Sequence, residues 1–310
     1  MRVLVTGAAG FAGTHLVRHL IEQGHDVAGL FRSPRDPISD CRTIRCDLTH
    51  RRRLAAVVQE AKPERVYHLA ALSRPRLSWQ RPRDFYRVNV MGTIHLLDAI
   101  RKAGLSCKTL AVSSGAVYKG QNGRRSLKED AATEARDPYS SSKILMEAVA
   151  LDYFRIFQMP IVIARPFNHC GPGQRLGFVV ADFCSQAVRI EQRRQKEPIR
   201  TGYLGAVRDF LDVRDVVRAY CELMESGREG EVYNVCSGEG TSLTNLLELV
   251  RQKARVPFSV RSERASSRGS DFRIGSAQKL RRASGFERRY ALAQTIEDTL
   301  EFWRSPESAG

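Results

Sequence analysis

Short apolar runs alternate with helically spaced apolar positions along the first half of the chain. Runs with the length of buried strands lie at 3–5, 26–31, 43–48, 65–71 and 109–114. Apolar side chains recur every three or four positions, as in helices, at 16–21, 54–61 and 85–103. This alternation predicts an α/β fold with a Rossmann-type, doubly wound parallel sheet, in which ligands bind at the carboxyl ends of the strands.

The pattern changes beyond residue 163, where loops lengthen and arginines become more frequent. An apolar strand is predicted at 231–235, and helices are predicted at 180–191, 215–225, 243–254 and 291–302. We interpret this half as a smaller C-terminal α/β domain that holds the substrate, followed by a frayed tail at 304–310. The predicted Rossmann domain comprises 1–165 and about 208–238, and the substrate domain comprises 166–207 and 239–310.

Composition is that of a globular protein with a sizeable core. The chain has 310 residues, of which 42% are hydrophobic and 27% charged. We expect no membrane span, since no apolar run is long enough, and no signal peptide, since the N-terminus leads straight into a strand. Seven scattered cysteines without a C-x-x-C pair favour reduced thiols in a cytoplasmic protein, without a disulfide framework or a metal site.

The charge balance is strongly basic, with 50 Lys and Arg against 34 Asp and Glu. Such a balance attracts nucleic acid, membranes or small polyanions. The basic clusters at 51–53 and 193–196 lack the interleaved aromatic residues of a single-strand binder. We therefore expect solvated helix faces and an attraction for anionic substrates, with no nucleic-acid or membrane partner.

Three glycines follow the first strand at the spacing G-x-x-G-x-x-G: Gly7, Gly10 and Gly13. Glycines allow a tight turn and a close approach of the backbone to a pyrophosphate, and the next helix N-terminus favours its negative charge. After the second strand, Arg32 and Arg35 stand where an NAD enzyme usually carries an acid for the ribose hydroxyls. Unless they are only loop charges, their guanidinium groups suit a 2′-phosphate, which favours NADP and leaves NAD open.

Tyr139 lies four residues before Lys143, after an Asp-Pro helix start and ahead of an apolar helical run. Positions i and i+4 share one face of a helix, so the phenol and the ammonium can point into one cavity. We expect the cation to lower the pKa of Tyr139 toward the range of a general acid/base. The pattern is also common on solvated surfaces, but the fifth strand supplies a further hydroxyl where it ends, at Ser114.

Other motifs occur in a fixed order over nearly the whole chain: Asp47-Leu48, His68 to Ala71, Asn89 with Gly92-Thr93, Val117-Tyr118 and Arg165 to Asn168. Together with the glycine turn and the Tyr139/Lys143 pair, they resemble the extended short-chain dehydrogenases/reductases that act on nucleotide sugars. The resemblance implies cofactor binding by Gly7, Gly10, Phe11, Ala12, Gly13, Arg32, Asp47, Leu48, Leu69, Ala70, Ala71, Val112, Tyr139, Lys143 and Pro166.

The resemblance also implies catalytic roles. Ser114 would hydrogen-bond the sugar C4 oxygen, Tyr139 would protonate that oxygen, and Lys143 would hold the nicotinamide ribose and lower the tyrosine pKa. The substrate diphosphate would be bound by Asn168 and Arg208, with a further arginine, Arg268, in a loop that departs from the family spacing. His169 is expected to be a structural turn residue.

Within the family, the stretches 165–174, 208–213 and 232–238 resemble GDP-6-deoxy-4-keto-mannose reductases, which make GDP-rhamnose. The related GDP-mannose 4,6-dehydratases carry a glutamate two residues before the tyrosine of the Ser/Thr strand-end motif. Here that tyrosine is Tyr118 and the residue two before it is Ala116, which cannot shuttle a proton. The departure argues against dehydration and favours reduction or epimerisation.

We therefore expect NAD(P)H-dependent reduction of the C4 ketone of a nucleotide-linked 6-deoxy-4-keto-hexose, with GDP-4-keto-6-deoxy-D-mannose converted to GDP-D-rhamnose as the favoured case. The alternatives are a nucleotide-sugar 4-epimerase or a GDP-mannose 4,6-dehydratase-like enzyme with tightly held NAD(P). A more remote one is a non-enzymatic dinucleotide-sensing regulator. The resemblance further implies a homodimer through the helices at 89–103 and 139–158.

Overall fold

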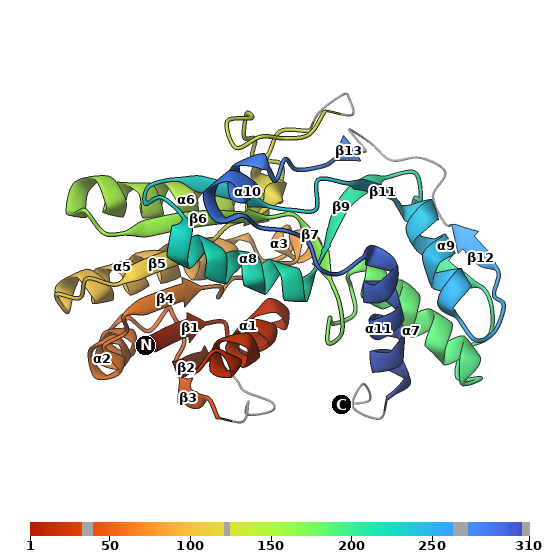
Figure 1. The fold of residues 1–310 in the computed structure, drawn as a ribbon, viewed down its shortest axis with the longest axis horizontal. Coiled ribbons are helices and arrows are strands. Elements are labelled where there is room, and N and C mark those ends of the chain that lie inside the picture. Colours follow the sequence, from red (N-terminus) through yellow and green to blue (C-terminus); the bar gives the residue numbers. More distant parts are fainter. Residues whose placement is uncertain (33–39, 121–124, 263–271, 306–310) are drawn as a thin grey trace.

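Seven parallel strands form the central sheet of the computed structural model, which describes residues 1–32, 40–120, 125–262 and 272–305 (Figure 1). Their spatial order is β10-β6-β5-β4-β1-β2-β3. The strands are β1 (Arg2–Thr6), β2 (Asp26–Phe31), β3 (Arg42–Arg45), β4 (Arg65–His68), β5 (Lys108–Val112), β6 (Ile161–Pro166) and β10 (Val232–Val235). The strand order reverses between β1 and β4, which is where doubly wound sheets bind their ligands.

Helices cover both faces of this sheet. On one face lie α1 (Phe11–Glu22), α8 (Val213–Ser226) and α10 (Gln278–Ser284), and on the other α2 (Arg51–Ala61), α5 (Gly92–Lys102) and α6 (Pro138–Phe157). Each face has its own apolar cluster, so the strands are buried on both sides. The prediction of a Rossmann-type α/β sheet is confirmed.

The helix predicted at 85–103 is divided in the structure. The short α3 (Pro75–Ser78) and α4 (Pro82–Phe85) precede a π-helical stretch, η1 (Tyr86–Met91), which continues into α5. Apolar spacing predicts the helix but does not reveal the wider turn. Such stretches are often found at functional sites, and this one contains the buried Asn89.

The helix α6 has a complete start signal. Asp137 accepts a hydrogen bond from the amide of Ser140 at 2.7 Å, the Ser140 hydroxyl closes the capping box, and Pro138 occupies the first turn. This start orients the following turns so that Tyr139 and Lys143 are both buried. The Asp-Pro signal in the sequence therefore marks the helix correctly.

A smaller region lies at the opposite end of the molecule (Figure 1). Its four-stranded sheet contains β7 (Asn168–Cys170), β9 (Val207–Asp212), β11 (Gly240–Ser242) and β13 (Phe272–Arg273), and β8 (Ile199–Thr201) pairs with β12 (Val260–Ser262). An apolar cluster joins α7 (Val179–Glu191), α9 (Leu243–Lys253) and α11 (Leu292–Arg304). The chain returns to the central sheet at β10, whereas β9 belongs to the smaller sheet. The division into two domains stays a prediction.

The expected frayed tail begins too early. Arg304 still belongs to α11, and its guanidinium pairs with Glu191 of α7 at 2.7 Å. Because both side chains are nearly buried, this residue anchors the helix, and the residues after 305 lie outside the described part of the chain.

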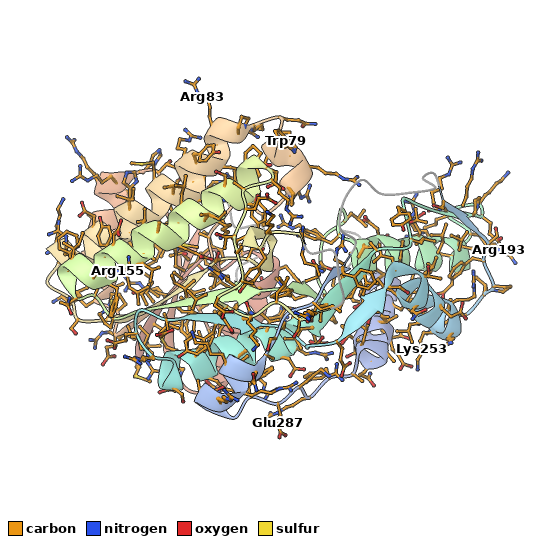
Figure 2. All side chains as sticks on the ribbon, turned by 90° about the horizontal axis from the view of Figure 1, so that it is seen from above. Trp79, Arg83, Arg155, Arg193, Lys253 and Glu287 are labelled. Atoms are coloured by element: carbon orange, nitrogen blue, oxygen red, sulfur yellow. The ribbon has the colours of Figure 1, made fainter. Side chains whose placement is uncertain are left out.

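The surface carries the excess of basic side chains. Figure 2 shows Arg83 at the upper edge and Arg193 at the right-hand edge, with Arg155 and Lys253 over other helices, so these four charges are spread. Among the described helices, none combines the length and the apolar character needed to cross a membrane.

Candidate active site

The glycine turn between β1 and α1 is closely packed. Gly7 has a φ of 74°, and a Cβ atom there would lie 2.7 Å from the backbone nitrogen of Ala70. A Cβ on Gly13 would lie 2.1 Å from the carbonyl oxygen of Gly7. The first turn of α1, with Phe11 and Ala12, follows directly. The backbone thus forms a bare cradle at a helix N-terminus, which fits the pyrophosphate of a dinucleotide.

The residues predicted to contact the adenosine end lie around the ends of β2 and β3. Arg32 is exposed directly after β2. Burial acts to raise the pKa of Asp47, but two hydrogen bonds outweigh this effect and lower the pKa overall. The donors are the Thr49 amide and the Thr49 hydroxyl, both at 2.8 Å. The charge of Arg32 lowers the pKa further. Leu48 is buried, with Gly92 against it. Arg35 lies outside the described residues.

The remaining predicted cofactor residues lie at the ends of the central strands. Leu69, Ala70 and Ala71 follow β4, and the Ala70 amide donates to Thr6 Oγ1 at 3.2 Å. Val112 ends β5 and Pro166 ends the neighbouring β6. The parallel sheet therefore brings these positions to the same edge as the glycine turn.

The three predicted catalytic residues lie together where β5 ends. Ser114 caps the short η2 (Gly115–Val117), its Oγ accepts from the Ala116 amide at 3.1 Å, and its side chain lies close enough to the Tyr139 phenol to act on the pKa of that group. The Tyr139 ring packs edge-on against Phe85, with centroids 6.3 Å apart. Lys143 Nζ donates to the Val112 carbonyl at 2.7 Å.

The expected lowering of the Tyr139 pKa is wrong for the protein alone. Burial raises the pKa of Tyr139, and the nearby Ser114 side chain opposes this only in part. Burial also lowers the pKa of Lys143 to about 8, against the effect of the Glu147 carboxylate. At Lys143 burial therefore outweighs the charge of Glu147, and at Tyr139 the charge of Asp137 adds to the effect of burial. Tyr139 therefore keeps its proton at neutral pH and can donate it.

A buried chain of polar contacts supports the catalytic helix and was not predicted from the sequence. Asn89 Nδ2 donates to Ser142 Oγ at 2.9 Å, and the Asn89 carbonyl accepts from the Thr93 hydroxyl at 2.7 Å. His68 lies between Thr93 Oγ1, at 2.9 Å, and Thr6 Oγ1, at 2.8 Å. Burial lowers the pKa of His68 to about 3, so the ring is neutral. The family motifs that contain His68, Asn89 and Thr93 were the signal in the sequence for this network.

Two of the predicted substrate residues line one cavity. Asn168 of β7 and Arg208 of β9 border a space of about 270 Å³ beside the start of α7. Arg208 Nη1 also donates to the Val207 carbonyl at 2.8 Å. The third, Arg268, lies outside the described residues. A larger cavity of about 490 Å³ borders α10 and contains none of the predicted site residues.

His169 lines the same cavity. Its Nδ1 is 3.1 Å from the Phe167 carbonyl oxygen, and its ring stacks on Phe11 with centroids 5.8 Å apart. Burial lowers the pKa of His169. These contacts make it a packing residue between the glycine turn and the substrate cavity.

A glycine turn on a doubly wound sheet, with Ser after a strand end and Tyr and Lys on an adjacent helix, defines an NAD(P)-dependent oxidoreductase of the short-chain dehydrogenase/reductase class. The family model described as GDP-mannose 4,6 dehydratase matches residues 4–304, so the chain belongs to this family of extended short-chain dehydrogenases/reductases. A nicotinamide dinucleotide is its cofactor. The family, the fold class and the enzyme class predicted from the sequence are confirmed.

Three similar proteins illustrate the range of the family. GDP-6-deoxy-D-mannose reductase of Pseudomonas aeruginosa is 33% identical over 308 residues, 98% of this chain and 97% of that protein. The structure of RMD from Pseudomonas aeruginosa complexed with NADPH covers 98% of this chain and 99% of its own, at 30% identity and a TM-score of 0.86. The structure of UDP-glucose 4-epimerase of Thermus thermophilus complexed with NAD covers 99% of this chain and 100% of its own, at 28% identity and a TM-score of 0.90.

Proposed function

We propose that this enzyme reduces the C4 ketone of a nucleotide-linked 6-deoxy-4-keto-hexose, and that GDP-4-keto-6-deoxy-D-mannose, giving GDP-D-rhamnose, is its substrate. The observation that carries the proposal is the Tyr139 phenol, which is buried beside Ser114 and keeps its proton at neutral pH because burial raises its pKa. Reduction of a ketone consumes one proton at the oxygen, and this arrangement holds one there. The full-length similarity to a GDP-6-deoxy-D-mannose reductase supports the substrate class.

The residues of the chain divide the work at the ketone oxygen. When bound, the nicotinamide cofactor supplies a hydride. Ser114 Oγ already accepts a hydrogen bond from the Ala116 amide, so its own proton is available for the developing oxyanion. Tyr139 delivers its proton to the same oxygen. The ammonium of Lys143, oriented by the Val112 carbonyl, holds the ribose and stabilises the phenolate that remains.

Ala116 limits the reaction to C4. Its amide supports Ser114, and its methyl side chain has no group that can take or return a proton at C5 or C6. A dehydratase-like reaction needs such a group. The family model that matches this chain is described as a GDP-mannose 4,6 dehydratase, yet Ala116 suits reduction and not dehydration.

The substrate diphosphate is proposed to bind in the cavity bordered by Asn168 and Arg208. A guanidinium and an amide donor suit phosphate oxygens, and the adjoining helix α7 starts at the same cavity. Arg268 stays a proposed contributor. A guanosine nucleotide is favoured by the GDP-linked relative.

NADP is the proposed form of the cofactor. Arg32 stands exposed at the end of β2, where the adenosine ribose of a dinucleotide lies in this fold, and its charge reaches Asp47. A guanidinium there attracts a 2′-phosphate. The solved relative complexed with NADPH is consistent with this choice, whereas the epimerase relative is complexed with NAD.

A homodimer in the cytoplasm is the proposed state of the enzyme. Large apolar side chains are exposed on η1 and α6, where Met91 is 43%, Leu145 44% and Ile156 68% exposed. Side chains of this size on two adjacent helices suit burial against a second copy. The resemblance implies the same pair of helices.

An epimerase acting on an intact nucleotide sugar is the second candidate, because the epimerase relative superimposes on the whole chain with a TM-score of 0.90. The same Ser, Tyr and Lys would serve both reactions, since one acid/base suffices for removal and return of a hydride. Cofactor behaviour separates the two candidates. An epimerase purifies with NAD bound and consumes none, whereas a reductase oxidises NADPH in proportion to keto-sugar.

The deciding experiment is a panel of GDP-, UDP-, dTDP- and CDP-linked 4-keto sugars with NADPH and NADH, followed by cofactor absorbance and product NMR. We expect stoichiometric NADPH oxidation with the GDP-linked keto-sugar and a 4-hydroxyl product. Interconversion of C4 epimers without net cofactor loss would support the epimerase. NADPH binding with no turnover on any sugar would instead favour a dinucleotide sensor.

A further inference from the structure

A second buried charge lies one helical turn beyond the catalytic lysine. Glu147 follows Lys143 by four residues on α6, so both side chains share one face of the helix. Lys143 is 4% exposed and Glu147 is 6% exposed. Two opposite charges in the interior attract each other over longer distances than at the surface, because little water screens them.

Glu147 is held by an arginine from the adjacent strand. Arg165 of β6 donates from Nε to Glu147 Oε1 at 2.9 Å and from Nη2 to Oε2 at 2.7 Å. Arg165 Nη1 donates to the Glu129 carbonyl at 3.1 Å, and the guanidinium lies over the Tyr118 ring, 4.8 Å from its centroid. Because Arg165 has partners on each side, it fixes the Glu147 carboxylate in one position.

We propose that Glu147 is a positioning residue for the reaction: held by Arg165, its carboxylate keeps the Lys143 side chain charged while the Val112 carbonyl orients that side chain beside Tyr139. The inference rests on the proposed function of Tyr139 and Lys143. It assigns to the Arg165–Glu147 ion pair a role in catalysis as well as in stability.

Other groups around α6 do not substitute for Glu147. Besides the basic side chains of α3, α4, η1 and α5, the charged or titratable groups on or beside the elements packed on this helix include His68, Asp84, Asp98, Tyr118, Glu129, Asp137, Tyr139 and Arg165. Asp84 and Asp98 pair with basic residues on or beside their own helices, and His68 is neutral. Asp137 caps the helix start. Glu147 is the acid that opposes the effect of burial on Lys143.

The sign of the expected pH effect follows from the charge of Lys143. The reaction needs the ammonium, so the rate falls as the pH rises through the pKa of Lys143, which burial lowers to about 8. Removing the Glu147 charge removes the group that raises this pKa. In Glu147→Gln, the alkaline fall of kcat should therefore move to lower pH, by about one to two pH units.

The experiment compares pH profiles of kcat for three variants. Glu147→Asp keeps the charge, so it should keep the alkaline fall near the wild-type position, whereas Glu147→Gln should displace it. The matched control is Glu191→Gln, which breaks an equally buried ion pair with Arg304, remote from the sheet edge. It should leave the alkaline fall in place. If Glu147 had a purely structural role, Glu147→Gln would lower kcat at every pH and leave the alkaline fall at its wild-type position.

A second measurement needs no substrate. The chain has nine lysines, so lysine labelled with ¹³C at Cε gives few resonances, and the Lys143 resonance is the one lost in Lys143→Met. We expect it to titrate at lower pH in Glu147→Gln than in the wild-type and Glu191→Gln proteins, with and without NADP⁺. If the enzyme has no activity on any keto-sugar, the proposed reduction fails but this titration still tests Glu147.

The proposal is overturned if, in Glu147→Gln, both the Lys143 titration and the alkaline fall of kcat stay at the wild-type pH. If that variant does not fold, Glu147→Gln with Arg165→Met removes both charges and leaves none unpaired. Lys143 should then titrate at lower pH than in the wild type, by a smaller amount, since the repulsive guanidinium is also removed. An unchanged titration in the double variant overturns the proposal equally.

Discussion

At Tyr139, burial and a serine hydroxyl act in opposite directions on one proton. Burial raises the pKa of the phenol, and Ser114 lowers it in part. The balance leaves a protonated group next to the position proposed for the C4 oxygen. An acid that is neutral until it donates suits a reductase, because the ketone gains a proton only as hydride arrives.

Replacing Tyr139 by Phe removes the donated proton and keeps the ring that packs on Phe85. We expect kcat to fall by roughly 10²–10⁴-fold, the usual contribution of a general acid. The dissociation constant of NADPH, measured by its fluorescence, should change little. Near-normal turnover in this variant would show that another group supplies the proton.

Arg32 is the residue on which the cofactor preference depends. In Arg32→Ala, we expect the KM for NADPH to rise about tenfold, the loss of one hydrogen bond to a charged group, with the KM for NADH unchanged. Arg42→Ala is the control, because Arg42 is a nearby exposed arginine that pairs with Glu60. Equal effects on both cofactors would contradict a 2′-phosphate contact.

Spacing along one helix made Tyr139 and Lys143 predictable, since positions four apart meet wherever the helix lies. The Arg165–Glu147 pair was not predictable, because its members stand 18 residues apart on a strand and a helix that meet only after folding. The direction of the Tyr139 pKa shift was also missed. It depends on how deeply the phenol is buried, which local spacing does not determine.

At the scale of elements, strands and helices followed from apolar periodicity, and the departures have physical causes. The predicted strand at 43–48 ends at residue 45, because Asp47 turns back to accept hydrogen bonds from Thr49. The predicted helix at 85–103 contains a π-helical stretch around Asn89. In both places a buried or half-buried polar side chain changes the local backbone.

The glycine turn is the element most sensitive to a single methyl group. In Gly13→Ala, the new Cβ would lie 2.1 Å from the Gly7 carbonyl oxygen, so the turn must open. We expect at least about a tenfold loss of NADPH affinity by isothermal titration, as for the loss of one charge-assisted hydrogen bond. Gly202→Ala is the control, because a Cβ atom added there would have no neighbour within 4 Å. Unchanged affinity in Gly13→Ala would show that the turn does not bind the cofactor.

At the scale of the whole molecule, the exposed apolar side chains of η1 and α6 indicate an interface. We expect Leu145→Asp with Ile156→Asp to convert the proposed dimer to a monomer at micromolar concentration in sedimentation equilibrium. Leu176→Asp is the control, because Leu176 is 48% exposed but lies outside both helices. A wild-type protein that sediments as a monomer would refute the dimer.

The interleaved order of the two sheets has a consequence for synthesis on the ribosome. The edge strand β10 of the central sheet comes after β9 of the smaller sheet in the chain. It also carries Asn234, which accepts from the Tyr118 hydroxyl at 2.6 Å. A nascent chain that has emerged only as far as β6 therefore exposes an unpaired strand edge. The catalytic half matures only after the first strands of the substrate-binding half have been made.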